Sequence, residues 1–369
     1  MNTIQVTALE KTNYSNMNGV YQDGVLAHAV DADGLTWGIL GHTNCGGITI
    51  WKGDGLENMQ QQYKAEFLFH FGEAGQAFHG SRYPDGPFAR GGIWPCGLWI
   101  DPSDQTFYCY VHNETGWEAG SSAYTIFAQQ EGEPDYRHIG LIKSMDQGRS
   151  WEFIDWIITS HSPSYSSYYT PDGIDGGQVG NIICLCSGDF SILPNKKDGY
   201  LYIFYTQSFF DCVSKTVVED KIYVARSLLS NKGKAGSWFK YYEGEFSEPG
   251  NCGRETPIAY QGAVPNVYYD ELHDCYIMSS YNREAWIKGE CTCRLQFSKN
   301  LTDWSKPVFI AKERPDLSKP YFTLYFNQKK KRLQLFMESN GTDVESVFID
   351  IDFENLWNKG GTGFAKKDK

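Results

Sequence analysis

The sequence lacks any run of about 18 apolar residues, the length that an α-helix needs to cross a bilayer. It also lacks a basic stripe, because the formal net charge is -12 and the only dense basic run is Lys329 to Arg332. That run is typical of a solvated hairpin turn. The sequence therefore predicts neither a membrane nor a nucleic-acid partner.

The spacings of zinc sites and of phosphate-binding loops are missing as well. The chain has 10 cysteines, and the pairs Cys184/Cys186 and Cys291/Cys293 place both members on one face of a strand, which predicts packing. Residues 1–11 have no apolar signal-peptide centre. Free thiols and a cytoplasmic location are therefore expected, whereas a leader ahead of Met1 would change this prediction to secreted or periplasmic.

Long helical periodicity is also hard to find. The chain is instead rich in residues that favour strands and tight turns, with Tyr 24, Phe 22, Trp 11 and Gly 38. No Pro/Ser-rich or charge-rich linker divides it. We therefore expect residues 1–369 to form a single all-β domain.

A repeated pattern of strands runs along the chain and is clearest in residues 188–227. A strand that starts near Asp189 is followed by the turn Asp198-Gly199, an aromatic strand and a third strand, which is typical of one blade of a β-propeller. Similar units start near Asp23, Ile93, Ala263 and Pro320. The sequence thus predicts a five-bladed β-propeller, with six blades as the alternative if residues 60–92 or 155–185 contain further strands.

Two turns between outer strands carry the sharpest local motifs. Ser144–Trp151 fits the Asp-box pattern S-x-D-x-G-x-x-W, and Ser298–Trp304 is a related form. In this pattern the acidic side chain caps backbone N–H groups, the glycine takes a left-handed conformation and the tryptophan packs on the blade. We expect both turns to be structural and not to contact substrate.

Together these patterns resemble the five-bladed β-propeller glycoside hydrolases, the superfamily of arabinanases, xylosidases and fructosidases, with a sialidase-type Asp-box. The resemblance rests on four segments: residues 188–205, 222–227, 265–269 and 301–304. The fructosidase and arabinanase signatures are absent, which leaves the particular family open. The resemblance implies cleavage of glycosidic bonds in an oligo- or polysaccharide, with no required cofactor and at most a structural calcium ion on the propeller axis.

Glycosidic cleavage needs a general acid and a second carboxylate, and the resemblance places such groups where inner strands begin. Asp23 and Asp189 stand about ten and nine residues before the Asp-Gly turns at 33–34 and 198–199. They therefore occupy equivalent positions in the first and third units. The resemblance implies that Asp23 is the general base and that Asp189 holds or tunes the acid.

Two glutamates are candidates for the general acid. Glu114 ends an aromatic strand and shares a strand face with His112, because side chains two residues apart point the same way. Glu255 lies on a polar connection just before the fourth unit. Either carboxyl group would need a raised pKa. The sequence leaves this choice open.

Candidate substrate-binding residues come mainly from loops rich in aromatic and arginine side chains. Aromatic faces stack on sugar rings, and guanidinium groups donate paired hydrogen bonds. The candidates are Arg82, Tyr83, Arg90, Trp94, His112, Tyr169 and Arg254.

Two other functions stay open. A sialidase-like enzyme, or a lyase acting on uronates, would need arginines such as Arg82, Arg90, Arg254 or Arg283 to converge beside a Tyr-Glu pair. A non-catalytic glycan-binding propeller would have aromatic residues but no two carboxylates within roughly 10 Å. His28 and His42 are expected to be satisfied core residues, and no metal ligands are predicted.

Overall fold

A computed structural model describes most of the chain. The described residues are 4–10, 22–69, 83–84, 89–117, 127–128, 133–160, 182–211, 213–290, 292–310, 321–339 and 343–353. Within them, regular structure is almost entirely β, and α1 (Arg283–Ile287) is the only α-helix. The prediction of an all-β chain is therefore confirmed. No helix in these ranges is both long and apolar enough to cross a membrane.

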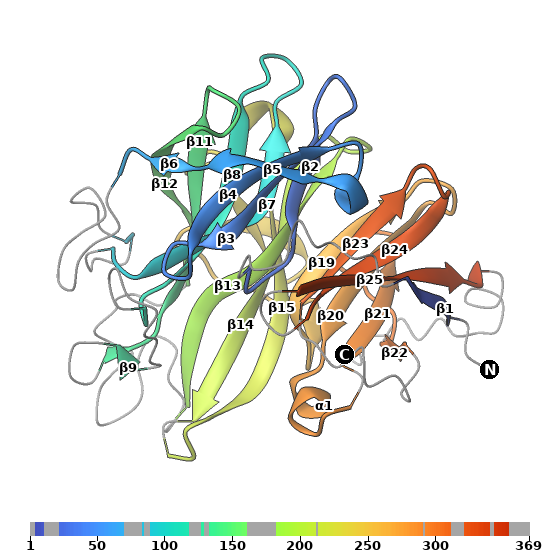
Figure 1. Cartoon of the computed structure of the whole chain (residues 1–369). Helices are drawn as coiled ribbons and strands as arrows, with labels where there is room; N and C mark the ends of the chain where they lie inside the picture. The colour runs from blue at the N-terminus through green and yellow to red at the C-terminus, as the bar shows by residue number, and fades with distance from the viewer. Residues whose placement is uncertain are drawn as a thin grey trace.

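Most strands form antiparallel groups of consecutive strands (Figure 1). The first group is β2 (Ala27–Val30), β3 (Thr36–His42), β4 (Gly47–Gly53) and β5 (Gln60–Lys64). The second is β7 (Gly92–Ile100), β8 (Phe107–Glu114), β11 (Arg137–Ser144) and β12 (Ser150–Ile158). The third is β13 (Ile182–Asn195), β14 (Tyr200–Asp211), β15 (Thr216–Leu228), β16 (Phe239–Tyr242) and β17 (Glu245–Pro249).

The remaining groups are formed by the C-terminal part of the chain, drawn in orange and red in Figure 1, and by one N-terminal strand, drawn in dark blue. One consists of β19 (Ala263–Asp270), β20 (Cys275–Tyr281), β21 (Cys293–Ser298) and β22 (Val308–Phe309). The other consists of β23 (Phe322–Asn327), β24 (Arg332–Ser339), β25 (Asp343–Ile351) and the N-terminal β1 (Ile4–Glu10). Because β1 pairs with β25, strands from the two ends of the chain lie side by side.

Short strands complete the β-structure. They are β6 (Glu66–Phe67), β9 (Phe127–Ala128), β10 (Glu133–Pro134) and β18 (Ala259–Tyr260). The second and third groups belong to one larger sheet, because Arg137 of β11 pairs with Cys186 of β13. This pairing brings the second and third strand groups together at the site described below.

Burial of both faces explains the sequence of the central strands. All residues of β8 are buried, and most of β14 is buried as well. Strands covered on both faces read as continuous apolar and aromatic runs, which matches the segments FYCYV and YLYIFY. The largest apolar cluster draws on the second to fifth groups and so joins sheets that are distant in sequence.

Two features of the strand groups are not part of the predicted repeat. Leu56–Asn58 forms a 3-10 turn, and β5 follows it as the fourth strand of its group. The turn is local, because Asn58 donates its backbone N–H to Gly55 O at 3.1 Å and its side-chain amide to Asp54 at 2.9 Å. The pairing of β1 with β25 also had no counterpart in the predicted repeat.

The two motif-bearing turns are held by their own side chains. Asp146 accepts hydrogen bonds from the Ser150 backbone at 2.9 Å and from the Ser144 hydroxyl at 2.7 Å. Trp151 Nε1 donates to Gly148 O at 2.9 Å, and in the second turn Trp304 Nε1 donates to Leu301 O at 3.0 Å. These contacts fit the structural role predicted for both turns.

Candidate active site

A cavity of about 340 Å3 lies where the beginnings of several strands meet. Its lining comes from distant parts of the chain: Asp23, Trp94, Glu114, Trp117, Arg137, Asp189, Val264, Tyr281, Arg283, Trp286 and Tyr321. Three of the four predicted catalytic carboxylates, Asp23, Glu114 and Asp189, therefore lie in one hollow.

Three lining residues share an unusual backbone conformation. Asp23, Asp189 and Val264 have φ values of 50°, 43° and 51°, which non-glycine residues seldom adopt. Asp189 is the extra residue of a β-bulge between Gly188 and Phe190, and Val264 lies in a second bulge, in β19. Bulges re-aim side chains next to binding sites. The predicted equivalence of the two aspartates thus extends to their backbone.

Hydrogen bonds hold this strained backbone in place. Thr206 donates its hydroxyl to Asp189 O at 3.1 Å and accepts the Val264 N–H at 2.9 Å. A β-branched residue at positive φ costs energy and persists only where its surroundings fix it. The threonine therefore links the bulges of two strand groups across the cavity wall.

Arg137 is the charged centre of the cavity. Its Nε lies 3.0 Å from Glu114 Oε1 and 3.5 Å from Asp135 Oδ2, and its Nη1 lies 2.9 Å from Asp189 Oδ2. One guanidinium group thus contacts three carboxyl groups. A single positive charge favours full ionisation of only some of them, so the arrangement favours a proton on one carboxyl group.

Asp189 is the member of this group that stays ionised. Burial alone would raise its pKa, but Arg137 and the contacts with His112 outweigh burial and lower the pKa of Asp189 to about 2. His112 Nδ1 lies 2.9 Å from the Asp189 backbone nitrogen and 3.2 Å from Asp189 Oδ1. The Asp189 backbone N–H donates to this ring nitrogen, which fixes the ring beside the carboxylate.

Glu114 has the opposite character. Trp117 Nε1 donates to Glu114 Oε2 at 3.0 Å, and the glutamate side chain is 8% exposed. Burial raises the pKa of Glu114 well above its ordinary value, and the negative charges of Asp135 and Asp189 raise it further against the opposing effect of Arg137. A buried carboxyl group with a raised pKa is suited to donate a proton near neutral pH.

Asp23 is also shifted towards its neutral form. Burial is the main cause of its raised pKa, Asp189 adds to it, and the Tyr321 hydroxyl, which donates to Asp23 Oδ1, opposes it. Asp23 and Asp189 occupy equivalent positions in the sequence repeat, but their pKa values are shifted in opposite directions. Asp23 contacts Tyr321, whereas Asp189 contacts the positively charged Arg137, and this produces the difference.

Aromatic rings form the remaining wall. Trp94 lies between His42 and His112, with ring centroids 4.3 Å and 4.4 Å apart. Burial lowers the pKa of His42 to about 3, so this ring is neutral at ordinary pH. On the opposite side Trp286 of α1 is 46% exposed and meets Tyr281 edge to face at 6.2 Å. The hollow thus combines carboxyl groups with flat apolar surfaces.

Glu255, the second candidate for the general acid, does not line this cavity. Its side chain is 3% exposed and lies 3.0 Å from Nζ of the fully buried Lys240. It also accepts hydrogen bonds from Tyr205 and Gln207. The sequence shows the polar neighbours of Glu255 but not its buried ion pair with Lys240. For this reason the sequence alone does not distinguish Glu114 from Glu255 as the general acid.

The predicted substrate-binding residues fall into different places. Trp94 lines the cavity, and His112 supports Asp189 from behind. Tyr83 is buried, stacks on His138 at 3.6 Å and accepts the Arg90 backbone N–H at 3.0 Å, so neither Tyr83 nor Arg90 reaches the cavity.

Of the other three candidates, only one is among the described residues. Arg254 points to the surface, where it pairs with Glu248 at 2.6 Å. Arg82 and Tyr169 lie outside the described residues.

Several lining residues were not predicted as site residues from the sequence: Trp117, Arg137, Val264, Tyr281, Trp286 and Tyr321. Arg283 was predicted only for the sialidase-like alternative. The repeat could have indicated Val264, because this residue lies at the start of the fourth unit. Asp23 and Asp189 lie at the starts of the first and third units. Arg137 and Tyr321 follow no repeated spacing.

Among the described residues, no group of three or more His, Cys, Asp and Glu side chains could hold a metal ion. His42 packs on Trp94, and His28 hydrogen-bonds Leu26 O at 2.8 Å. The calcium ion that the resemblance implies stays a prediction.

No family model and no curated protein matches the chain. Among solved structures, the exo-beta-1,3-galactanase from Phanerochaete chrysosporium, solved with galactose, has a TM-score of 0.50 at 9% identity, covering 89% of this chain and 60% of that chain. A thermostable family-43 glycoside hydrolase has a TM-score of 0.47 at 11% identity over 94% and 92%. The alpha-L-arabinofuranosidase from Lactobacillus brevis has 0.46 at 10% over 89% and 91%.

The likeness to the galactanase shows a shared fold and nothing further at this identity. The resemblance to glycoside hydrolases that the sequence predicted is therefore confirmed at the level of the fold. The chain spans 60% of the length of that galactanase.

Proposed function

We propose that this chain is a five-bladed β-propeller glycoside hydrolase that cleaves its substrate in the Asp23–Glu114–Asp189 cavity. Each strand group serves as one blade, and β1 completes the last blade beside β25. One observation carries the proposal: carboxyl groups from three strand groups line one hollow, and their pKa values are shifted in opposite directions. Unequal carboxyl groups in one site are the mark of acid–base chemistry.

Each carboxyl group has a distinct role in this proposal. Glu114, kept neutral by burial, protonates the oxygen of the leaving group. Asp23 takes a proton from the attacking water. Asp189 stays ionised, and through Arg137 and His112 it fixes the orientation of the acid. No step requires a cofactor.

The substrate in this proposal is a neutral oligo- or polysaccharide. Trp286, which is 46% exposed, offers a flat apolar face to a sugar ring, and Trp94 Nε1 is a buried donor without a partner among the described residues. The galactanase was solved with galactose, and the other relatives include an arabinofuranosidase. Galactosides and arabinosides are therefore the first substrates to test.

The geometry gives less support to the alternatives. Of the arginines that a sialidase-like or uronate-lyase site would need, only Arg283 among the described residues lines the cavity, and it is paired with Asp220 at 2.8 Å. Arg137 is engaged by carboxyl groups. A non-catalytic glycan-binding propeller would not need three carboxyl groups in its hollow.

The direct test is a screen of the purified protein against 4-nitrophenyl glycosides and natural polysaccharides. We expect release of 4-nitrophenol or of reducing sugar from at least one neutral substrate. Absence of turnover throughout the panel, together with saturable binding of a neutral glycan, would favour the non-catalytic alternative.

A further inference from the structure

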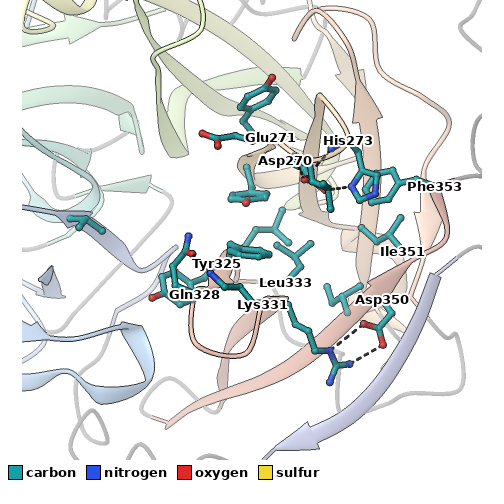
Figure 2. A pocket seen from close by; sticks show the side chains of 18 of the residues that line it. Asp270, Glu271, His273, Tyr325, Gln328, Lys331, Leu333, Asp350, Ile351 and Phe353 are labelled. Carbon is teal, nitrogen blue, oxygen red and sulfur yellow. Dashed lines mark hydrogen bonds and ion pairs between the residues drawn. The ribbon is translucent and has the colours of Figure 1, made fainter. Parts of the chain in front are cut away.

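A second hollow in the described structure is separate from the cavity of the candidate active site. It has a volume of about 920 Å3, inside the range of roughly 300–1,000 Å3 that is usual for small-molecule sites. Two turns flank this hollow: the β19–β20 turn, which carries Asp270 and His273, and the β23–β24 turn. Figure 2 shows Tyr325 and Leu333 between them. We name this hollow the distal groove.

Strand geometry places the distal groove at the opposite end of the inner strands. Strand β19 lines the cavity at Val264 and the groove from Tyr268 onward, while the chain entering β23 lines the cavity at Tyr321 and the groove at Tyr325. In the first group, the cavity residue Asp23 is followed by His28 in the groove. At about 3.3 Å per residue, these four to five residues separate the two sites by about 13 to 17 Å.

The floor of the groove is aromatic. Tyr268 and Phe326 stack in parallel at 6.4 Å, and Tyr325 is held edge to face by Phe336 at 5.9 Å. Phe353 stacks on His273 at 3.8 Å. Rings fixed in this way present rigid apolar surface at little cost in conformational entropy.

The rim of the groove is polar, and it carries carboxylates and cations in similar number: Asp270, Glu271 and Asp350 against Lys331 and Arg332. Asp350 pairs with Arg332 at 2.8 Å (Figure 2). This balance leaves little net charge to attract an ionic ligand. Exposed Gln328 offers an additional donor and acceptor. An uncharged ligand with many hydroxyl groups and an apolar face matches this surface.

We propose that the distal groove is a second, non-catalytic binding site for a neutral oligosaccharide. This inference rests on the proposed function, because the groove would hold a stretch of the polysaccharide whose bonds are cut in the cavity. Aromatic floor residues stack on sugar rings, and rim side chains bond to hydroxyl groups. The site adds affinity for long substrates and leaves the cleavage of short ones unchanged.

The test is native gel electrophoresis in gels containing arabinogalactan, arabinoxylan or laminarin, with the full chain carrying Asp189→Asn to prevent cleavage. We expect retardation in at least one gel. Adding Tyr325→Ala should weaken the apparent affinity about ten-fold, as expected for the loss of one aromatic contact. The double change Glu271→Ala and Gln328→Ala, at exposed rim positions, should weaken it less and decides the test if Tyr325→Ala impairs folding.

The matched control is Tyr260→Ala, which removes a 57% exposed tyrosine outside the groove and should leave retardation unchanged. Absence of retardation in all three gels, or retardation untouched by the groove variants, would overturn the proposal. A dimer in light scattering that Tyr325→Ala dissolves would also overturn it, because a second copy would then fill the groove. Turnover of 4-nitrophenyl glycosides by the otherwise unchanged chain tests the proposed function separately.

Discussion

Two buried acidic clusters of this molecule invite comparison. In one, Glu255 meets the fully buried Lys240 at 3.0 Å, and Lys240 also donates to Thr159 O and to Gly253 O. In the other, Glu114 and its neighbours surround Arg137 at the wall of a cavity. Both clusters bury a glutamate beside a cation.

The difference lies in charge balance and access. Lys240 meets one carboxylate and two carbonyl oxygens, which satisfies all three of its hydrogens. Arg137 meets three carboxyl groups, and the cluster faces empty space. Burial of a carboxylate is therefore not enough to indicate a catalytic site. Unequal protonation next to a cavity is the better criterion.

The largest effect is expected from removing the negative charge of Asp189. In Asp189→Asn, Arg137 loses one of its anionic partners and acts more strongly on Glu114, whose pKa falls so that the acid ionises. We expect kcat to fall about 10²- to 10⁴-fold with folding intact. Turnover and circular dichroism measure the two effects, and wild-type turnover in this variant would remove Asp189 from the mechanism.

The matched change in the enclosed cluster should act on stability. Glu255→Gln leaves the Lys240 charge buried without its carboxylate, so the free energy of unfolding should fall by about 3–5 kcal/mol. The kcat of the folded enzyme should change little. Urea unfolding checks this prediction, and Glu255→Gln combined with Lys240→Met should regain part of the stability. Loss of turnover without loss of stability would place Glu255 in the catalytic machinery.

Much of the fold could be predicted from sequence, because the strand groups repeat short aromatic strands joined by polar turns, with an Asp-Gly turn in the first and third groups. Asp23 and Asp189 were predicted from their similar spacing to these two turns. The partner of each carboxyl group could not be predicted in this way. Arg137 reaches Asp189 because β11 pairs with β13 at Cys186, and Lys240 of β16 meets Glu255 on the connection that follows β17.

A smaller effect is expected behind the cavity, at Gly188. A Cβ atom there would lie 2.5 Å from His112 Nε2, so Gly188→Ala must displace the ring that supports Asp189. We expect a loss of about 1–3 kcal/mol in the free energy of unfolding, the usual cost of overpacking. In a His112→Ala background the same change should cost less, and thermal denaturation of the four proteins measures this coupling. Equal costs in both backgrounds would show that no clash with His112 occurs.

The pH dependence of kcat/KM sharpens the contrast between the carboxyl groups. Asp23 must be ionised, so activity should fall as the pH drops through its raised pKa. Glu114 must be protonated, so activity should fall as the pH rises through its pKa, which lies well above the ordinary value. Asp189, with a pKa of about 2, should add no limb above about pH 3. A profile without an alkaline limb would contradict the role of Glu114.

The proton donated by Glu114 is the central claim, and leaving-group dependence tests it most directly. Glu114→Gln should lower kcat/KM by about 10²- to 10⁴-fold for a glycoside whose leaving group needs protonation, such as an alkyl or phenyl glycoside. For the matching 2,4-dinitrophenyl glycoside, whose leaving group departs without a proton, the loss should be small. Equal losses for both substrates would contradict the account.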